Sequence, residues 1–472
     1  MHRFTKIVCT IGPATSSVKA IKELIRAGMD VARLNFSHGT GEEQIEHIRL
    51  VRRVSSQMGR EVAILQDLPG PKLRIGNMGN RPVMLNKGAT VTLSTEALTG
   101  SSDIIPVSFT QLPRIVHEES KIYLADGTVR LRVNSVGQNS VKCEVEMGGF
   151  VATGKGINIP RLASKVPALT QKDLELIKIG VENSVDYVAV SFVSTPEDMH
   201  QAKNEIRRAG GDASVISKIE KVEAAEHCKD IISASDAVMV ARGDLGVELG
   251  PEKVPMVQKK IIHEANRLGK PVITATQILL NMLHEPTPTR AEVSDIANAI
   301  LDGTDALMLS EETAVGPYYK EAVETLARVS KTVEHEFGRS LYHPVDGENV
   351  QEATAAAACQ VAAATKAKCI VAYTWSGATA RVVSKNRTHI PICSFSPVQS
   401  TVRQLCLVWG VESRLMPESR TEISREEVEK RVRRFGFASD GDRVVVVAGF
   451  PTGRPGTTNM IRVQDIGDSR AS

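Results

Sequence analysis

The chain has 472 residues, of which 42% are hydrophobic, 24% charged and 4% aromatic, and its formal net charge is +3. This length suits about three globular domains, and the balanced charge argues against a dedicated nucleic-acid binder. The seven cysteines form no CxxC pair, and no apolar run approaches the ~20 residues of a membrane-spanning helix. We therefore expect a cytoplasmic protein with reduced thiols, no signal peptide and no membrane partner.

Eight short apolar runs alternate with helical patterns over residues 1–74 and 156–340. The runs are Lys6–Thr10, Asp30–Asn35, Val62–Asp67, Tyr187–Ser191, Val215–Ile219, Ala237–Ala241, Pro271–Ala275 and Ala306–Ser310. Near-continuous apolar runs are typical of parallel strands that are buried on both faces. Eight such βα units predict an α/β fold with a closed (β/α)8 TIM barrel as the catalytic domain.

Two further segments differ from this pattern. Residues 75–155 separate the third run from the fourth and alternate hydrophobic with polar residues in short stretches, which predicts an inserted small β-barrel domain. Residues 341–472 open with an Ala-rich helical stretch and predict a C-terminal open α/β domain. The strands expected there are Cys369–Tyr373, Ile390–Phe395 and Arg443–Ala448.

Polar and charged residues follow most of the barrel runs. They include Arg33, Asn35, Ser37, His38, Asp67, Ser191, Lys218, Glu220, Gly243, Asp244, Thr276 and Ser310. Each has a simpler interpretation as a rim ion pair, a helix cap or a turn residue. Because the carboxyl ends of barrel strands face one opening, so many of them together favour a shared active site.

The residue types at this opening suit phosphoryl transfer beside a carboxylate. Glu220 and Asp244 offer hard oxygen ligands for Mg²⁺, with Mn²⁺ as an alternative. Lys218 and Arg33 supply positive charge to a phosphoryl group in transit. A glycine at 243 lets backbone N–H groups approach an anion at a helix N-terminus, and the hydroxyl at 276 would lie close to the reacting carbon.

A loop of the third domain has the composition of a phosphate-binding nest. It combines hydroxyls, a glycine and a helix start, and its candidate residues are Thr374, Trp375, Ser376, Gly377 and Thr379. The segment Phe450–Asn459 is expected to form the opposing loop. The alternative is a plain strand-to-helix turn in which Thr374 caps the helix.

The chain resembles the pyruvate kinase family over essentially its whole length. The matching segments are TKIVCTIGP (Thr5–Pro13), VARLNFSHG (Val31–Gly39), ISKIE (Ile216–Glu220), MVARGDLGVE (Met239–Glu248), KPVITATQ (Lys270–Gln277) and PTRAEVSDIANAILDGTDALMLSEET (Pro288–Thr313). The resemblance implies Mg²⁺-dependent phosphoryl transfer from phosphoenolpyruvate to ADP, giving pyruvate and ATP in glycolysis.

The resemblance also implies individual roles. Lys218 would stabilise the transferring phosphoryl group and the enolate. The other implied catalytic residues are Arg33, Thr276 and Ser310, and the metal ligands are Glu220 and Asp244. The implied substrate-binding residues are Arg33, Gly243, Asp244, Thr276 and Ser191. The implied nucleotide contacts are Arg74, Lys155, Asn35, His38 and Asp126. The inserted domain is expected to close as a lid, a phosphorylated metabolite to act as effector at the loop of Thr374, and the assembly to be a homotetramer.

One departure from the family bears on its monovalent cation. Many members hold K⁺ with residues that match Asn35, Ser37, Asp67 and the carbonyl of Leu68, whereas Lys72 stands where potassium-dependent members carry Glu. An ammonium can supply the single positive charge of that ion. We expect a potassium-independent enzyme, and the alternative is a solvated Lys72 with the ion still bound.

Two other functions remain open at this level. Another barrel enzyme acting on phosphoenolpyruvate or a keto acid, of aldolase or mutase type, would share the carboxylates and the arginine but would not need a nucleotide-closing lid. A non-catalytic relative that only binds sugar phosphates would not need Lys218, Glu220, Asp244 and Thr276. Glu311, where the family usually carries Gly, is a further departure of undetermined effect.

Overall fold

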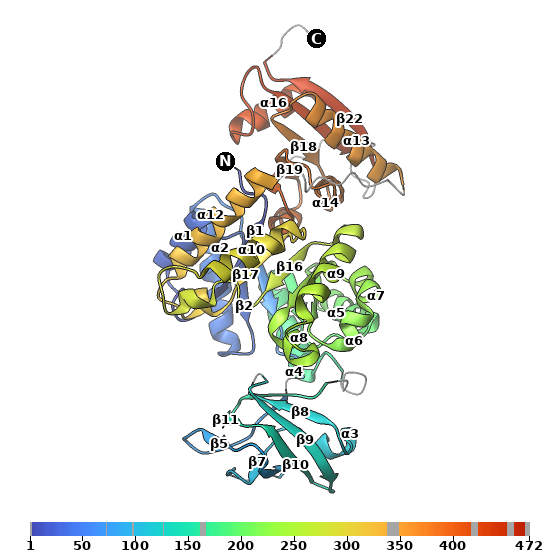
Figure 1. Ribbon diagram of the computed structural model, residues 1–472. Helices are drawn as coiled ribbons and strands as arrows, with labels where there is room; N and C mark the ends of the chain where they lie inside the picture. The colour runs from blue at the N-terminus through green and yellow to red at the C-terminus, as the bar shows by residue number, and fades with distance from the viewer. Residues whose placement is uncertain are drawn as a thin grey trace.

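The computed structural model describes residues 2–71, 73–96, 99–125, 127–160, 167–337, 349–416, 423–450 and 457–467 (Figure 1). The barrel lies in the middle of the molecule, with the inserted β domain at one end and the C-terminal domain at the other (Figure 1). The two smaller domains therefore contact opposite ends of the barrel.

Eight parallel strands close the barrel in the order β1-β17-β16-β15-β14-β13-β3-β2. Their bounds are β1 Lys6–Ile11, β2 Val31–Asn35, β3 Ala63–Asp67, β13 Tyr187–Val190, β14 Ser214–Ile219, β15 Ala237–Ala241, β16 Val272–Ala275 and β17 Ala306–Leu309. The predicted barrel is confirmed, and the observed strand ends differ from the predicted ones by at most one residue. Every residue of β1, β3, β15, β16 and β17 is buried, as expected for strands covered by helices on the outside.

Several barrel helices begin at caps that the sequence encodes. α2, α4 and α10 start after Thr40, Thr170 and Thr289, each of which forms a reciprocal capping box with an acidic residue three positions later. The bounds are α1 Val18–Ala27, α2 Gly41–Gln57, α4 Gln171–Glu182, α5 Pro196–Arg208, α6 Val222–Glu226, α7 Cys228–Ala234, α8 Arg242–Leu249, α9 Val254–Arg267, η2 Leu280–Leu283, α10 Arg290–Leu301, α11 Glu311–Ala314 and α12 Tyr319–Phe337.

The inserted domain is a curled sheet in the order β4-β12-β8-β9-β10-β6-β7, with the pair β11-β5 beside it, and its strands are antiparallel except for the parallel pair β6-β7. An antiparallel bridge between Ile75 and Val107 joins the two outer strands, so the sheet closes on itself. Its bounds are β4 Leu73–Arg74, β5 Val83–Leu85, β6 Thr90–Ser94, β7 Ile104–Pro106, α3 Leu112–Ile115, β8 Lys121–Leu124, β9 Val129–Val136, β10 Ser140–Met147, β11 Gly149–Val151 and β12 Gly156–Asn158. The hinge strands β4 and β12 pair with each other and connect this sheet to the barrel.

The C-terminal domain is an open sheet in the order β20-β19-β18-β21-β22, in which only β22 is antiparallel to its neighbour. Its bounds are α13 Val350–Ala364, β18 Cys369–Tyr373, α14 Ala378–Lys385, β19 Ile392–Ser396, α15 Gln399–Gln404, η3 Leu405–Leu407, β20 Val411–Leu415, α16 Arg425–Arg434, β21 Arg443–Gly449 and β22 Thr458–Asp465. The three predicted strands are present, and β20 and β22 add two that were not predicted. β22 includes part of the segment expected to form a loop, and residues 451–456 of that segment lie outside the described residues.

A turn of the C-terminal domain closes the amino-terminal end of the barrel. Leu407 in η3 is completely buried and packs in the same cluster as the barrel-interior side chains of Tyr187, Met239 and Ile273. The hydroxyl of Tyr187 donates a hydrogen bond to the carbonyl of Gln404. These contacts make the barrel floor and the third domain one packed unit.

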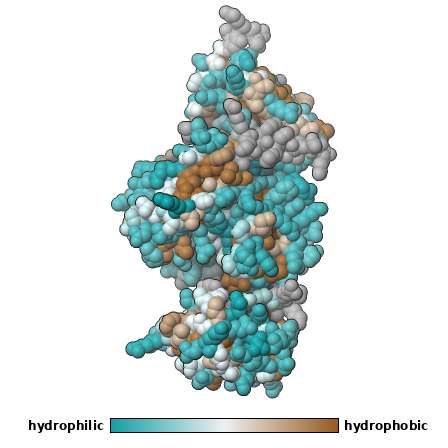
Figure 2. Space-filling model, viewed as in Figure 1, coloured by the Kyte–Doolittle hydropathy of each residue, from teal (hydrophilic) through white to brown (hydrophobic). Residues whose placement is uncertain are grey.

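The remaining surface is mainly hydrophilic on the face in Figure 2, and hydrophobic residues gather on the barrel just below the C-terminal domain. Within the described residues, no helix combines the length and the apolar character that crossing a bilayer requires.

We predict that Leu407→Ala lowers the free energy of unfolding by about 2–5 kcal/mol, because it removes a buried side chain and leaves a cavity between two domains. Urea unfolding followed by circular dichroism measures this. Leu415→Ala is the matched control, since Leu415 lies in the same domain and is 36% exposed. Equal losses in the two variants would contradict the role of Leu407 as a floor residue.

Candidate functional site

A cleft of about 930 Å³ opens at the carboxyl ends of the barrel strands. It brings together most of the predicted site residues, namely Arg33, Asn35, His38, Asp67, Lys218, Glu220, Gly243, Asp244, Thr276 and Ser310. They come from six different strands or strand ends, so the closed barrel is what makes them neighbours.

Lys218 occupies the centre of this cleft near the end of β14. Its Nζ lies 2.9 Å from Glu220 Oε1 and 3.1 Å from Asp67 Oδ1, and it donates a 2.7 Å hydrogen bond to Ser191 Oγ. Burial alone would lower the pKa of Lys218, but the two carboxylates outweigh burial and raise it. The lysine is therefore a fixed ammonium, which suits electrostatic stabilisation and not proton abstraction.

Arg33 and Lys218 share one counter-ion. Arg33 Nε and Nη2 lie 2.8 Å and 2.6 Å from Asp67 Oδ2, and Arg33 Nη1 donates to Thr10 Oγ1 at 3.0 Å. Burial alone would raise the pKa of Asp67, but the charges of Lys218 and Arg33 outweigh it and hold the pKa below its usual value. Asp67 thus fixes two cations at the positions where an anionic substrate would meet them.

Glu220 and Asp244 form the candidate metal site. Glu220 is buried and accepts a 2.9 Å hydrogen bond from the backbone N–H of Phe192, while Asp244 lies in the first turn of α8. Burial raises the pKa of Glu220, Lys218 opposes this, and the nearby charge of Asp244 raises it further. A bound cation would relieve this repulsion. Two carboxylates suit an ion such as Mg²⁺, which takes its other ligands from water and substrate.

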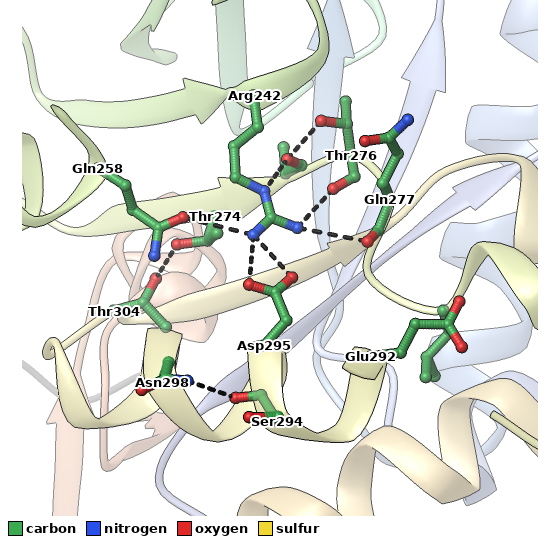
Figure 3. A network of polar contacts seen from close by, with 12 residues as sticks. Arg242, Gln258, Thr274, Thr276, Gln277, Glu292, Ser294, Asp295, Asn298 and Thr304 are labelled. Carbon is green, nitrogen blue, oxygen red and sulfur yellow. Dashed lines mark hydrogen bonds and ion pairs between the residues drawn. The ribbon is translucent and has the colours of Figure 1, made fainter. Parts of the chain in front are cut away.

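Thr276 sits on a strained turn that Arg242 holds in place (Figure 3). Thr276 and Gln277 have φ values of 69° and 53°, a left-handed conformation that is costly for residues with a side chain. The guanidinium of Arg242 donates to the carbonyls of Ala275 and Thr276 at 3.2 Å and 2.7 Å and pairs with Asp295 at 2.7 Å. The turn aims the Thr276 hydroxyl at the start of α8, where it accepts a 2.9 Å hydrogen bond from Gly243 N.

Sequence reasoning missed two residues that shape this opening. Arg242 is not among the predicted site residues, although its position directly before Gly243 and Asp244 is a usable signal. Glu312 is 1% exposed and accepts hydrogen bonds from the backbone N–H groups of Ser310 at 2.7 Å and Leu279 at 3.1 Å. It fixes the eighth strand end against the turn after β16.

The predicted nucleotide contacts are divided. Asn35 and His38 line the cleft. Arg74 lies on the hinge strand β4 and donates to Gly154 O at 2.8 Å, and Lys155 is exposed directly before β12. Neither of these two cations lines the cleft. Asp126 and Lys72 lie outside the described residues.

The remaining members of the predicted cation site surround Asp67. The side-chain oxygen of Asn35 accepts a 3.1 Å hydrogen bond from Ser37 N. The carbonyl of Leu68 accepts one of 2.7 Å from Ser191 Oγ, the group that also binds Lys218.

The candidate effector loop lies in the C-terminal domain, between β18 and α14. Gly377 has a φ of 84° and is the N-cap of α14, so Thr374 does not cap this helix. Trp375 is 43% exposed, and Thr379 is buried with its hydroxyl 2.8 Å from that of Thr458 on β22. The predicted phosphate-binding loop therefore does lead into the start of a helix. The hydroxyl of Thr379, however, is already hydrogen-bonded to that of Thr458.

A half-buried acid on α8, Glu248, lies beside the hinge of the inserted domain. The side chain of Asn158 and the backbone of Val222 lie near the Glu248 carboxylate and favour its charged form, and its Oε2 has no hydrogen-bond partner. Burial, followed by the nearby charge of Glu223, raises its pKa to about 7, and Lys221 opposes this. Glu248 therefore links the hinge strand β12 to the helix that carries Asp244.

Comparison with known proteins gives two family-model matches. Residues 2–323 match the model described as pyruvate kinase, barrel domain, and residues 352–464 match the pyruvate kinase alpha/beta domain. Curated proteins named pyruvate kinase from Staphylococcus aureus strains USA300 and COL are each 41% identical over 481 aligned residues, which cover 100% of this chain and 82% of each relative. The protein of strain MRSA252 gives the same identity and coverage.

We predict that Glu248 makes the protein less stable as pH rises from 4.5 towards 7. The folded state keeps a proton that the unfolded state has already lost in this window, because the pKa of Glu248 is raised to about 7. The free energy of unfolding should fall by about 3 kcal/mol across it. Urea unfolding at several pH values should show this slope in the wild type and a flatter one in Glu248→Gln. The exposed neighbour Glu252 supplies the control, and a Glu252→Gln variant with the same flattening would refute the assignment.

Proposed function

The chain belongs to the pyruvate kinase family of phosphotransferases, and from this premise we propose that it transfers the phosphoryl group of phosphoenolpyruvate to ADP with Mg²⁺ as cofactor. The observation that carries the proposal is the position of Lys218. Its ammonium lies within 3.1 Å of two carboxylates, beside a second cation and a helix start, inside one cleft.

The start of α8 is suited to hold the substrate carboxylate. The first N–H groups of a helix have no intrahelical acceptor and carry partial positive charge. The N–H of Gly243 donates to Thr276 Oγ1 at 2.9 Å, which holds Thr276 beside this helix start. We assign Gly243, Asp244 and Thr276 to the keto-acid part of the substrate, which then presents its phosphoryl group towards Lys218 and Arg33.

Lys218 and Arg33 supply the charge that phosphoryl transfer needs. Both are immobilised by Asp67, so little reorganisation accompanies the reaction, and electrostatic stabilisation by preorganised groups is the main catalytic tool for this chemistry. Magnesium bound by Glu220 and Asp244 would add positive charge beside the phosphoryl oxygens and the enolate. Ser191 keeps the ammonium of Lys218 directed into the cleft.

The inserted domain would close over this chemistry. A second cavity of about 1180 Å³ separates it from α8, with Tyr123, Gly127 and Arg130 on the domain side. Closure would bring Arg74 and Lys155 from the hinge towards the nucleotide and exclude water from the phosphoryl group. An aldolase or mutase transfers nothing to a nucleotide and would not need a lid that closes over one. An inserted domain in this position therefore favours a kinase.

We predict that Lys218→Met lowers kcat/KM for ADP-dependent pyruvate formation by at least about 10³-fold, because it removes the central charge from a preorganised site. A coupled assay with phosphoenolpyruvate, ADP and Mg²⁺ measures this. Lys178→Met, an exposed lysine on α4, should keep full activity. If the wild type forms no pyruvate from these reactants, the proposal is wrong. If it forms pyruvate at a rate that does not depend on ADP, the aldolase or mutase alternative is favoured.

We also propose that the enzyme does not require K⁺. Lys72 replaces the Glu of potassium-dependent members, and two of the groups that match potassium ligands already have hydrogen-bond donors, since Asn35 Oδ1 accepts from Ser37 N and Leu68 O from Ser191 Oγ. These contacts support the proposal, and Lys72 itself lies outside the described residues.

Replacing K⁺ by tetramethylammonium should leave the wild-type rate nearly unchanged. Lys72→Glu removes the built-in charge, so we expect it to lose at least about tenfold in kcat without K⁺ and to recover when K⁺ is added. A wild type that stops working in tetramethylammonium contradicts the hypothesis. Lys87→Glu, an exposed lysine of the inserted domain, controls for the change of net charge.

The finer properties implied by the family are proposed with it. We assign a phosphorylated metabolite to the loop of Thr374, Trp375, Ser376 and Gly377, supported by the left-handed Gly377 at the start of α14. We retain the homotetramer as the expected assembly. The seven free cysteines suit the reducing cytoplasm.

A further inference from the structure

An ion pair outside the catalytic cleft faces the turn that carries Thr276 (Figure 3). Arg242 and Asp295 line the second cavity, between the inserted domain and α8, and neither lines the cleft that holds Lys218. Thr276 lines only the cleft, and Gln277 lines both spaces. The turn after β16 therefore separates the catalytic groups from this ion pair.

The turn directs its carbonyl oxygens at one positive group. The carbonyls of Ala275, Thr276 and Gln277 accept hydrogen bonds from the guanidinium of Arg242, at 3.2, 2.7 and 3.4 Å. Three carbonyl dipoles that converge on one point repel one another unless a positive charge lies there. Two successive left-handed residues with side chains also persist only where their surroundings hold them. Arg242 thus offsets both the repulsion and the backbone strain.

Asp295 on α10 fixes the direction of this guanidinium. Nη1 of Arg242 lies 2.8 Å from Oδ1 and 2.7 Å from Oδ2 of Asp295. Gln258 Oε1 adds only a 3.4 Å contact to the same nitrogen. Because a guanidinium is planar and rigid, anchoring Nη1 leaves Nε and Nη2 directed at the turn.

The nearby acid Asp302 does not substitute for Asp295. Asp302 already pairs with Lys259 and accepts a 3.2 Å hydrogen bond from Gln258 Nε2. The side chain of Arg242 is only 11% exposed, and a buried cation that loses its counter-ion is strongly destabilised. Without the charge of Asp295, we expect the guanidinium to turn towards the water of the second cavity and to leave the carbonyls.

The hydroxyl of Thr276 depends on the same contacts. It donates a 2.6 Å hydrogen bond to Ala275 O, the carbonyl that also accepts from Arg242 Nε, and it accepts one of 2.9 Å from Gly243 N. A shift of the Ala275 carbonyl therefore moves the hydroxyl relative to the helix start that we assign to the substrate. A misplacement of about 1 Å in such a site can cost on the order of 10²-fold in rate.

We propose that Asp295 is a positioning residue of the reaction. Acting through Arg242, it holds the turn after β16 in its left-handed conformation and keeps the Thr276 hydroxyl in place in the cleft. The inference rests on the proposed phosphoryl transfer, and it gives a kinetic role to an acid on α10 that lies outside the cleft.

Asp295→Asn should lower kcat about 10²-fold and leave KM for ADP unchanged, because the nucleotide contacts assigned above lie on other elements. The coupled assay measures both constants. Asp295→Glu keeps the charge and should recover at least about tenfold of the loss. Asp230→Asn, an exposed acid on α7, is the matched control and should behave as the wild type. A folded Asp295→Asn with wild-type kcat, or equal losses in Asp295→Asn and Asp295→Glu, would overturn the proposal.

A double-mutant cycle separates positioning from general damage. Once Thr276→Val has removed the hydroxyl, adding Asp295→Asn should lower kcat by less than about threefold, whereas two independent defects would multiply. Multiplied losses contradict the proposal. Should Asp295→Asn fail to fold, Arg242→Lys takes its place in the cycle, because it keeps the charge but loses the planar set of donors.

The two proposals fail in different ways. A wild type that forms no pyruvate from phosphoenolpyruvate and ADP refutes the proposed function. The positioning of the turn is then decided by the crystal structure of Asp295→Asn, in which we expect Thr276 and Gln277 to leave the left-handed region. A turn that keeps its conformation and its contacts with Arg242 in this variant overturns the role of Asp295.

Discussion

The catalytic opening depends on keeping one ammonium buried and charged. Moving an isolated cation out of water costs several kcal/mol even after the protein relaxes, and Lys218 has a side chain only 13% exposed. Asp67 at the end of β3 and Glu220 directly after β14 offset this cost, and Asp67 does the same for Arg33. The same carboxylates therefore explain why the cluster is stable without ligands and why it can receive an anion and a divalent cation together.

The need to keep Lys218 charged explains why the loops that follow the barrel strands are held by hydrogen bonds and ion pairs. A charge cluster with partners on β2, β3 and β14 tolerates little movement of the strand ends that carry it. Phe192 N holds Glu220 from the end of the adjacent strand β13, and Arg242 at the start of α8 fixes the strained turn of Thr276. The strain of that turn is maintained by an arginine that is itself anchored by Asp295, outside the cleft.

Much of this arrangement was predictable from the sequence because it follows from local patterns. Buried parallel strands are continuous apolar runs, and the rule that strand ends of a barrel share one opening sufficed to bring Lys218, Glu220 and Asp244 together. β20 and β22 escaped prediction because they carry Glu412, Arg414 and alternating polar residues, as strands near the edges of a sheet do. Glu312 escaped because a buried acid that binds backbone N–H groups has no local signature. Arg74 and Lys155 lie at the hinge of the inserted domain, outside the cleft, and no local pattern encodes how that domain is oriented on the barrel.

The barrel floor shows how the third domain can reach the catalytic opening through a short rigid element. Tyr187, at the first position of β13, donates its hydroxyl hydrogen to Gln404 O of the C-terminal domain. Four residues later, about 13 Å along the strand, Ser191 accepts the hydrogen bond of Lys218. α15, which ends at Gln404, also contacts the candidate effector loop, because Thr401 Oγ1 donates to Trp375 O at 3.0 Å. A strand paired on both sides cannot stretch, so a displacement of α15 must either be absorbed at the Tyr187 contact or be transmitted to the partner of Lys218.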